Sequence, residues 1–488
     1  MQKTVKYQDS PRDRTLWGEG EMGSPAVRGG DVHLKPNGRV SLQWLTACEE
    51  ERALTADLME RIAELSNLAT AMRQVVSNGG SAGIDGMTVT ELKEWFTHNW
   101  HVLQSSLLEG SYTPNGVRGV RIPKPKGGYR QLGIPTVKDR LVQQAISQVL
   151  SKRYEPIFSE HSYGFRPGRN AHQALRKAAG YVAEGYKYVV DLDLEKFFDK
   201  VNHDRLMWML GTRIGDKRVL SLVGKFLRSG IMQDGLMSQR LQGTPQGSPL
   251  SPLLSNIVLD ELDKELEVRG HRFVRYADDS IILVRSEEAA NRVLNNITDF
   301  IEDRMLLKVN REKSRLCQPL ELNFLGYSIL INGGLGISRE SIRKFKQKLR
   351  RSTSRNKGIS LEQLIQGINP VLRGWLNYFR LARMRKHLGK LESWLRHRIR
   401  CFRLKQCKRT IGIVRFLRSR GLPERRVWLF ALSGKGWYRL ANSPGANEAM
   451  NLAWFVEIGL FGLTANYCLT FKETAPYVKR MRGGVRGS

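Results

Sequence analysis

The sequence predicts a mixed α+β core followed by an all-helical region, and three observations support this fold class. Two short β-rich segments, 186–194 and 271–285, carry acidic residues and lie among stretches of helical periodicity. Beyond about Ile337 the β-prone segments stop, and apolar residues recur at helical spacing. The chain has 488 residues, of which 41% are hydrophobic, so it can bury more than one core.

The chain is expected to begin with a flexible arm. Residues 1–50 combine glycine, proline and charge without a sustained apolar period. Residues 51–335 are expected to form the mixed core. Its first part, Glu51 to about Phe96, has a helical pattern around a glycine-rich loop at 77–88.

Residues 112–136 are predicted to form a hairpin or a loop, because four prolines and five glycines separate short β-prone pieces. This segment would expose a group of basic side chains, namely Arg118, Arg121, Lys124, Lys126 and Arg130. Residues 138–154 follow as a predicted helix with one apolar face.

The two β-rich segments carry carboxylates where each strand ends. Tyr186–Leu194 is predicted to be a strand that ends in acids, and His271–Arg285 a hairpin with Asp278 and Asp279 at its tip. Adjacent carboxylates repel each other, and at a hairpin tip they are suited to holding a hard cation such as Mg²⁺. An ordinary Asp-rich turn is the alternative. If the two strands are neighbours, their carboxylates converge on one point, as two-metal phosphoryl transfer requires.

Residues 336–432 are predicted to be helical. An apolar stripe over 361–368 begins at a capping box of serine and glutamine and recurs over 372–379, with Asn369-Pro370 breaking the pattern between them. A third stripe covers 391–402.

The charge of the chain points to a polyanionic partner. Lys and Arg number 79 against 47 Asp and Glu, which gives a net charge of +32, and residues 341–430 alone hold 26 basic residues and three Glu. A solvated helix face is the plain alternative, but this density over three amphipathic helices favours nucleic acid. The sequence has no membrane-spanning apolar run, no signal-peptide pattern and five scattered cysteines, so a cytoplasmic, nucleoid-associated protein is expected.

These residues resemble a known family. Tyr276-Ala277-Asp278-Asp279, preceded by the Asp-x-x-x-Phe-Phe-Asp of 193–199, is similar to the palm of a reverse transcriptase. Further blocks agree in order and spacing: Ile122–Pro125, Arg130–Pro135, Asp139-Arg140, Ser162–Arg169, Gly243–Pro249, Ser251–Asn256 and Phe324–Tyr327. Together they resemble the reverse transcriptases of bacterial group II introns. Gly367–Pro370 and Arg373–Phe379 resemble the maturase domain, or thumb, of the same proteins, and the resemblance covers roughly residues 55 to 465.

The resemblance implies a right-hand polymerase, with fingers and palm over 51–335 and a helical thumb and maturase domain over 336–432. It implies an RNA-directed DNA polymerase that also assists splicing of its intron and retrohoming by target-primed reverse transcription. The implied partners are group II intron RNA, target DNA and the template–primer duplex. The implied cofactor is a pair of Mg²⁺ ions, for which Mn²⁺ could substitute, and the substrates are deoxynucleoside triphosphates.

The resemblance also implies a catalytic set. Asp193 and Asp278 match metal ligands, with the backbone carbonyl of Leu194 as a further ligand, and Asp279 matches their supporting neighbour. Asp191 points to the same strand face as Asp193, so periodicity leaves both open and only the likeness to the family favours Asp193.

A further set is expected at the incoming nucleotide. Lys124 and Arg130 match residues that grip the triphosphate, for which an ammonium and a guanidinium are well suited. Phe198 matches the ring under the sugar that selects deoxynucleotides, unless Phe197 is the exposed member of the pair and Phe198 packs in the core. Gln246 matches a side chain that touches the sugar or base.

Contacts to template or intron RNA are expected from a set of basic side chains: Arg118, Arg166, Arg169, Arg373, Lys344 and Lys348. For His172, in the same block as Arg166, a structural role is an equal alternative. His203 is expected to belong to a helix cap rather than to the catalytic set.

Many members of the family end in an HNH nuclease, which needs histidine. The last histidine is His397, so an endonuclease-lacking protein is expected, primed by the nascent strand of a replication fork. Residues 433–488 are then an accessory segment, helical from Met450 to Leu463, for which DNA contact is one option. A maturase with decayed polymerase activity and a domesticated reverse transcriptase are the alternative functions. The oligomeric state stays open, and nothing supports a dimer.

Overall fold

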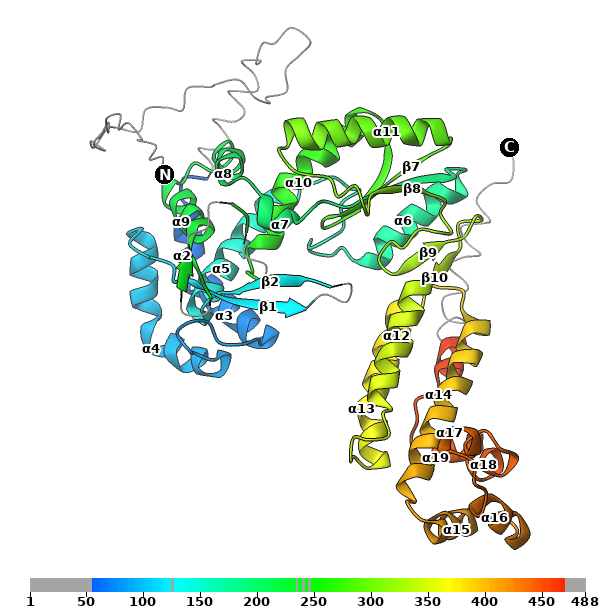
Figure 1. Cartoon of the computed structure of the whole chain (residues 1–488). Coiled ribbons are helices and arrows are strands. Elements are labelled where there is room, and N and C mark those ends of the chain that lie inside the picture. The colour runs from blue at the N-terminus through cyan, green and yellow to red at the C-terminus, as the bar shows by residue number, and fades with distance from the viewer. Residues whose placement is uncertain (1–54, 124–126, 234–235, 239–241, 245–246, 470–488) are drawn as a thin grey trace, which may run out of the picture. The chain divides into compact units, whose positions relative to one another are not determined.

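A four-stranded antiparallel sheet carries the catalytic-type motifs, in the strand order β6-β7-β3-β8. Two of its strands, β7 and β8, are labelled in Figure 1. The structure is a computed structural model and describes residues 55–123, 127–233, 236–238, 242–244 and 247–469. The strands are β3 (Tyr188–Leu192), β6 (Arg272–Tyr276), β7 (Asp279–Val284) and β8 (Arg315–Cys317). The predicted hairpin is confirmed, with Ala277 and Asp278 as its turn.

Both faces of this sheet are buried, because successive residues of a strand point into different hydrophobic cores. Val189 and Ile281 lie in one core, together with α6 (Ala171–Ala183) and the helices after residue 338. Val190 and Ile282 lie in the other core, which includes α10 and α11. The last two helices span Ser251–Val268 and Glu287–Asp299.

The N-terminal part of the described chain packs helices beside a second small sheet. Its elements are α2 (Leu58–Ala63), α3 (Leu65–Asn78), α4 (Val89–Leu108), β1 (Val117–Pro123), β2 (Tyr129–Ile134) and α5 (Val137–Tyr154). The β1–β2 hairpin and the α5 helix confirm the predictions for 112–136 and 138–154. β1 also pairs with β4 (Ile231–Gln233), which pairs with β5 (Leu236–Ser238).

Shorter elements connect these units to the sheet. They are α7 (Phe197–Lys200), α8 (His203–Gly211), α9 (Lys217–Arg228), the π-helix η1 (Phe300–Arg304), β9 (Tyr327–Ile329) and β10 (Leu335–Ile337). Asn202 caps α8 by accepting a hydrogen bond from the backbone of Arg205. The buried ring of His203 lies 2.7 Å from the carbonyl of Gly243, which gives that histidine a structural role.

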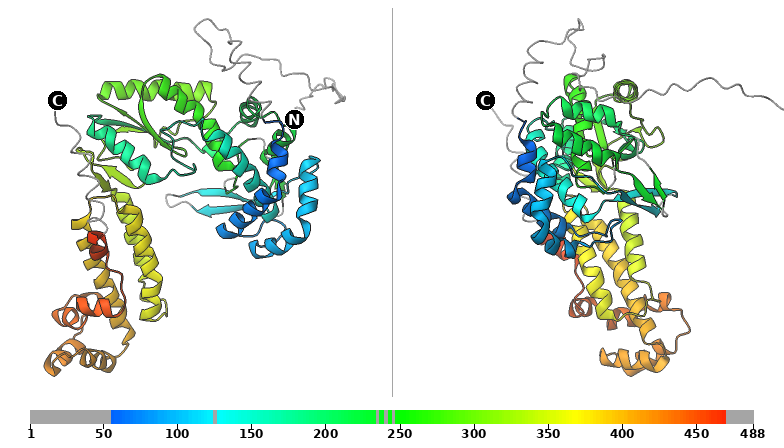
Figure 2. Two further views of the ribbon diagram at one scale, coloured as in Figure 1. Left: turned by 180° about the vertical axis from the view of Figure 1, so that it is seen from behind. Right: turned by 90° about the vertical axis from the view of Figure 1, so that its left-hand side faces the viewer.

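The rest of the described chain is helical, as predicted, and α12, α13 and α14 run alongside one another in Figure 2. The helices are α12 (Arg339–Ser352), α13 (Leu361–Phe379), α14 (Arg385–Gln406), α15 (Thr410–Ser419), α16 (Glu424–Ala431), α17 (Trp437–Leu440), α18 (Pro444–Ala449) and α19 (Leu452–Glu457). The capping box at the start of α13 is present. Across the described ranges, none of the helices combines the length and the apolar character needed to cross a bilayer.

Two predictions about these helices were wrong. Asn369-Pro370 does not break the helix, because α13 continues through Pro370 to Phe379. Leu364 and Leu372, on either side of the proline, are buried in one core, and Asn369 bonds the carbonyl of Gly459 at 2.8 Å. Tertiary packing therefore outweighs the local preference of proline.

The apolar stretch from Met450 to Leu463 is also not one helix. The helix α19 ends at Glu457, and Gly459 follows in a left-handed conformation with a φ of 74°. Glycine adopts such a conformation without steric penalty and commonly ends helices in this way.

One backbone carbonyl ties the sheet region to α13. The carbonyl of Tyr378 accepts a hydrogen bond from the Tyr327 hydroxyl and lies 2.7 Å from Nε2 of His172. The Tyr378 hydroxyl donates to the carbonyl of Leu325 at 2.9 Å. His172 therefore has the structural role that was one of its two alternatives.

Candidate active site

The strand register brings the two acidic segments together. β3 and β7 are antiparallel, and Leu192 pairs with Ser280. One further step along this register sets Asp193 opposite Asp279, and Asp278 lies in the adjoining turn. Neighbouring strands are about 4.8 Å apart. The carboxylates of both segments therefore share one end of the sheet.

This crowding changes the acidity of the aspartates. Asp279 is solvent-accessible, but the surrounding protein desolvates its carboxylate and raises its pKa to about 6, and the negative charges of Asp278, Asp193 and Asp191 add to the rise. Burial also raises the pKa of Asp278, with the charge of Asp193 acting in the same direction. Carboxylates with raised pKa values are destabilised as anions, so the site favours a cation placed among them.

Two basic side chains lie near this cluster. The ammonium of Lys313 forms an ion pair with the Asp193 carboxylate. The positive charge of Arg130, on β2, lowers the pKa of Asp278 against the effect of burial. Arg130 therefore lies close enough to Asp278 to act on its charge.

Asp191 differs from Asp193 in its surroundings. Burial raises the pKa of Asp191 to about 6, and Arg315, its partner across β3 and β8, partly offsets this effect. Asp193 lies beyond the strand end, with its own cationic neighbour in Lys313. Both carboxylates thus have a basic neighbour. Because Asp193 lies beyond the end of β3 and Asp191 lies within the strand, Asp193 is the more accessible metal ligand of the two.

The site offers carboxylate and carbonyl oxygens, which are the kind of ligand that Mg²⁺ prefers. Leu194 lies opposite Val309 in an isolated antiparallel bridge. The hydrogen bonds of this bridge are made by the residues on either side, from Glu195 to Lys308 and from Asn310 to Asp193. The carbonyl of Leu194 therefore points away from the segment that carries Val309. Within the described residues, no three His, Cys, Asp or Glu side chains are placed to hold a metal ion. Mg²⁺ sites commonly use one or two carboxylates and leave other positions to phosphates and water.

A glycine supports the tip of the hairpin. A Cβ atom at Gly164 would lie 2.1 Å from the backbone nitrogen of Ala277, a distance that no side chain tolerates. Ala277 itself has a φ of 57°, which is uncommon for a residue other than glycine. The Ser162–Arg169 block therefore sets the position of the turn that carries Asp278.

A buried ion pair lies beneath the same turn. Arg275 and Asp263 are 0% exposed, and Nε of Arg275 donates to Asp263 at 2.7 Å. Arg275 also donates to the carbonyl of Ala277 at 3.0 Å and to Asn256 at 2.9 Å. Asn256 in turn donates to the carbonyl of Gly164 at 2.9 Å. This network joins α10, the glycine loop and the catalytic-type turn.

The two phenylalanines on α7 have different environments. Phe197 is 2% exposed and lies in a hydrophobic core, whereas Phe198 is half-buried. The placement fits Phe198 as the member that can meet a sugar. The backbone of Thr244 donates to the Phe198 carbonyl at 2.6 Å, so the segment leading toward Gln246 is anchored at this phenylalanine. Lys124 and Gln246 themselves lie outside the described residues.

The structure corrects the expectation for Arg166. Its guanidinium is buried, and all three of its nitrogen atoms donate to Glu155 or to the carbonyls of Ser159 and Ser162. No donor remains for a template phosphate, so Arg166 holds the loop together. Arg169 is partly committed as well, since it donates to the carbonyl of Glu160 at 2.7 Å.

The other predicted RNA contacts are exposed. Arg118 reaches the carbonyl of Ala82 at 3.4 Å from the surface of β1. Lys344 and Lys348 lie one helical turn apart on the exposed face of α12, and Arg373 is exposed on α13. These side chains remain proposed nucleic-acid contacts.

Two residues at the site were not singled out from the sequence. No motif in the sequence marks Lys313, because its position opposite Asp193 follows only from the pairing of β8 with β3. Phe165, beside Gly164, is 54% exposed with a φ of 57°. A strained, exposed aromatic ring next to a catalytic-type turn is suited to stacking on a base, and only the block around it was recognised in the sequence.

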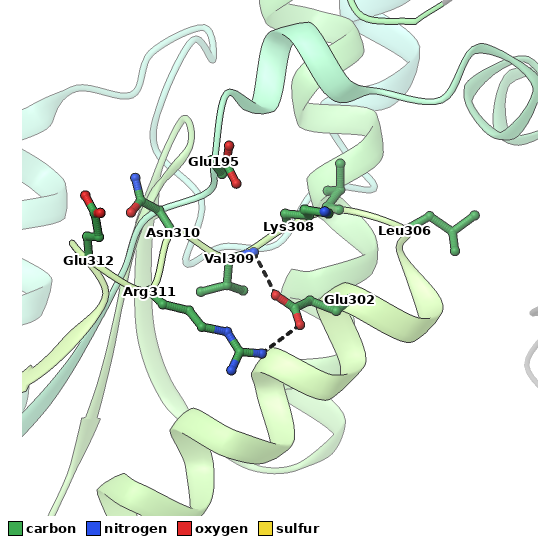
Figure 3. Close-up of a pocket in the computed structure, with 9 residues that line it drawn as sticks. Glu195, Glu302, Leu306, Lys308, Val309, Asn310, Arg311 and Glu312 are labelled. Carbon is green, nitrogen blue, oxygen red and sulfur yellow. Dashed lines mark hydrogen bonds and ion pairs between the residues drawn. The ribbon is translucent and has the colours of Figure 1, made fainter. Parts of the chain in front are cut away.

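An open cavity of about 820 Å³ adjoins this end of the sheet (Figure 3). It is lined by Glu195, Glu302 and residues 306–312, and the strand-end aspartates are not among its lining residues. Its charges are partly paired, because Arg311 bonds Glu302 at 3.0 Å. The cavity is therefore a neighbour of the candidate active site and not the site itself.

Two families match consecutive parts of the chain. The family described as reverse transcriptase (RNA-dependent DNA polymerase) matches residues 122–329, which include β3, β6 and β7. The family described as group II intron, maturase-specific domain matches residues 342–420, which include α13 and α14.

Individual proteins are similar to the chain over about half its length. Protein YkfC of Escherichia coli (strain K12) is 30% identical over 314 residues, which are 56% of this chain and 82% of YkfC. Group II intron-encoded protein LtrA of Lactococcus lactis subsp. cremoris is 29% identical over 342 residues, which are 55% of this chain and 56% of LtrA. The chain thus spans little more than half the length of LtrA. A solved structure titled "Partial Cas6-RT-Cas1--Cas2 complex" is 26% identical, has a TM-score of 0.33, and is matched over 50% of this chain and 42% of that chain.

Removing the buried carboxylate beneath the turn should destabilise the fold. Asp263→Ala leaves the guanidinium of Arg275 buried without its partner, and we expect a loss of about 3 to 5 kcal/mol in the free energy of unfolding. Glu265→Ala is the matched control, because it removes the partner of Arg269 from the same helix at a solvent-accessible site and should lose at most about 1 kcal/mol. Denaturant unfolding measures both, and equal losses would contradict this role of the network.

Neutralising the crowded tip should stabilise the chain in a pH-dependent way. The pKa of Asp279 is about 6 in the folded chain against 3.8 for the ordinary group. The neutral acid therefore contributes stability that is complete below about pH 4 and is lost as the pH rises through 6. Relative to the parent, Asp279→Asn should gain stability between pH 4 and 7. The gain should be on the order of 1 kcal/mol, because solvent screens this exposed group.

Denaturant unfolding of the parent and of Asp279→Asn at pH 4 and at pH 7, in the presence of EDTA, measures this difference in stability. Adding Mg²⁺ at pH 7 should shrink it, because the cation relieves the same repulsion. A stability difference that does not change with pH would show that the carboxylates are not crowded.

Proposed function

The chain belongs to the family of group II intron-encoded reverse transcriptases with a maturase domain, and from this premise we propose that it is an RNA-directed DNA polymerase that also assists splicing of its intron. The observation that carries the proposal is the pairing of Leu192 with Ser280, because it gathers Asp193, Asp278 and Asp279 at one sheet end. A decayed polymerase would not need to keep these three carboxylates together.

The proposed catalytic residues divide the chemistry among them. Asp193, Asp278 and the carbonyl of Leu194 would hold Mg²⁺, with Asp279 adding negative charge beside them. When bound, a pair of divalent ions supplies charge stabilisation for the attacking oxygen and the leaving pyrophosphate. Arg130 faces Asp278 and would orient the triphosphate through its forked N–H groups.

Sugar selection is proposed for Phe198. The ring of Phe198 is half-buried, whereas the ring of Phe197 is buried in the core. The centroids of the two rings are 5.3 Å apart. A fixed ring under the sugar leaves no room for a 2′-hydroxyl group. The chain would therefore use deoxynucleoside triphosphates in preference to ribonucleotides.

The basic helices are proposed to hold nucleic acid. Residues 341–430 carry 26 Lys and Arg against three Glu, and Lys344, Lys348 and Arg373 are exposed there. Such a surface binds phosphates without reading sequence and recognises folded RNA by shape. We propose intron RNA and the template–primer duplex as its partners, with retrohoming into target DNA in the bacterial nucleoid as the biological outcome.

Loss of one metal ligand should separate the two activities. Asp278→Asn should lower primer extension on an RNA template by roughly 10³-fold or more, while splicing assistance stays within a few-fold of the parent, because RNA is held by other helices. Asp299→Asn is the control, since it removes an exposed carboxylate from α11. Splicing lost in parallel with extension, in a folded variant, would contradict the separation. A parent chain unable to extend any primer would instead favour a decayed polymerase.

Removing the aromatic ring of Phe198 should weaken the preference for deoxynucleotides over ribonucleotides. We expect Phe198→Ala to reduce the preference for deoxynucleotides over ribonucleotides by about 10- to 100-fold, because the contact with the 2′ position is lost. Phe197→Leu is the matched control, which should reduce stability through the core and leave the preference intact. Single-nucleotide incorporation kinetics compare them. A stronger effect from Phe197→Leu would assign the role to the other ring.

A further inference from the structure

A second, strongly basic pocket lies within the helical region. It has a volume of about 200 Å³ and is formed where the loop after α12 meets α14 and α17. Its lining residues are Arg350, Thr353, Ser354, Arg355, Asn356, Arg398, Cys401 and Tyr438. The lining thus combines three guanidinium groups with hydroxyl and amide groups, and it includes no carboxylate.

The base of the pocket is rigidly built. Thr353 is 1% exposed and accepts a hydrogen bond from Nε of Arg398 at 2.6 Å. Nη2 of Arg398 donates to the backbone carbonyls of Arg350 at 3.2 Å and Thr353 at 3.3 Å, so Nη1 is the group left to meet a ligand. On its other side, the guanidinium of Arg398 lies 5.6 Å from the ring centroid of Trp394, and that of Arg350 lies 5.9 Å from the same ring. These contacts hold two of the three guanidinium groups in place before any ligand arrives.

The positive charges of this pocket lack a counter-ion. Burial lowers the pKa of Arg398, and the like charges of Arg350 and Arg355 lower it further. Within the part of the chain that the structure describes, none of these three arginines forms a salt bridge with an acid. The cavity of Figure 3 differs in this respect, because Glu302 neutralises Arg311 there.

The remaining groups match an oxyanion that is part of a nucleotide. Asn356 accepts a hydrogen bond from Lys405 at 2.7 Å through its amide oxygen, so its N–H groups are left as donors. Tyr438 is 59% exposed, and its ring lies 4.3 Å from that of His397. An exposed aromatic ring beside a basic pocket offers a base a surface on which to stack.

We propose that this pocket binds one phosphate group of the backbone of folded RNA, with Arg350, Arg355 and Arg398 as its ligands. The exposed guanidinium groups of Arg350 and Arg355 can recognise phosphate through pairs of parallel hydrogen bonds, and Arg398 can add its Nη1 group. The inference rests on the proposed function, because all lining residues except Tyr438 lie in the span that matches the maturase-specific family. It adds a defined phosphate site to what is otherwise a diffuse basic surface.

The test uses Arg355→Gln, because Arg355 is exposed and its loss should leave the fold intact. The full chain binds a labelled transcript of the intron that encodes it, at a series of salt concentrations. We expect about a 5- to 10-fold loss of affinity, and a slope of log affinity against log salt that falls by about one, as for one lost phosphate contact. Arg292→Gln removes the same charge from an exposed arginine on α11, outside the basic helices of 341–430, and should leave the slope unchanged.

Two results would overturn the proposal: equal changes in slope for the two variants, which would indicate a diffuse field, or no change for either. Arg355→Lys retains the charge without the fork and should restore the slope but not the full affinity. Thermal unfolding with inorganic phosphate at constant ionic strength adds a direct probe. The parent should be stabilised more than Arg355→Gln, and equal stabilisation would count against the site.

A separate readout distinguishes this site from the proposed function. Primer extension by the parent chain on poly(rA) with an oligo(dT) primer tests the proposed polymerase activity without the intron transcript. No extension by the parent chain would mean that the polymerase assignment fails. Normal extension with an unchanged salt slope would mean that only the pocket fails.

Discussion

The antiparallel register between β3 and β7 is the constraint on which the rest of the site depends. Because side chains alternate between faces, a slip of one residue would turn Asp193 to the opposite side of the sheet and away from Asp279. The register is held by two hydrophobic cores, one on each face, which Val189 and Val190 enter on opposite sides. Apolar packing on both faces thus determines where three negative charges meet, although those charges repel one another.

The structure compensates that repulsion locally and leaves the larger positive charge for a ligand. Lys313 and Arg130 stand beside the aspartates, and the buried Arg275–Asp263 pair fixes the turn from below. In the helical region positive charge predominates instead, because residues 341–430 carry many basic side chains and only three Glu. One end of the sheet is therefore suited to cations and the helices to polyanions, which is the division of labour that a polymerase bound to nucleic acid requires.

Much of this arrangement could be predicted from the sequence, because its strongest signals are local. Tyr276–Asp279 between two β runs indicates a hairpin tip, and Ser360 with Gln363 indicates a helix start, whatever the rest of the chain does. The errors arose where distant residues decide. Pro370 stays helical because both halves of α13 share one core. Arg166 looked like an exposed ligand in sequence, but Glu155 and two carbonyls of its own loop use its donors. The pairing of Lys313 with Asp193 depends on a register that sequence spacing does not contain.

The most direct test asks whether a single divalent ion is shared by the two strand ends. Fe²⁺ bound in place of Mg²⁺ reduces added hydrogen peroxide to hydroxyl radicals, with ascorbate recycling the iron, and these radicals cleave the backbone close to the metal. The account predicts cleavage of the full chain in two segments, around Asp193 and around Asp278, with both cuts suppressed together by excess Mg²⁺. Cleavage at only one of these segments, or cuts that Mg²⁺ suppresses independently, would contradict a common metal site.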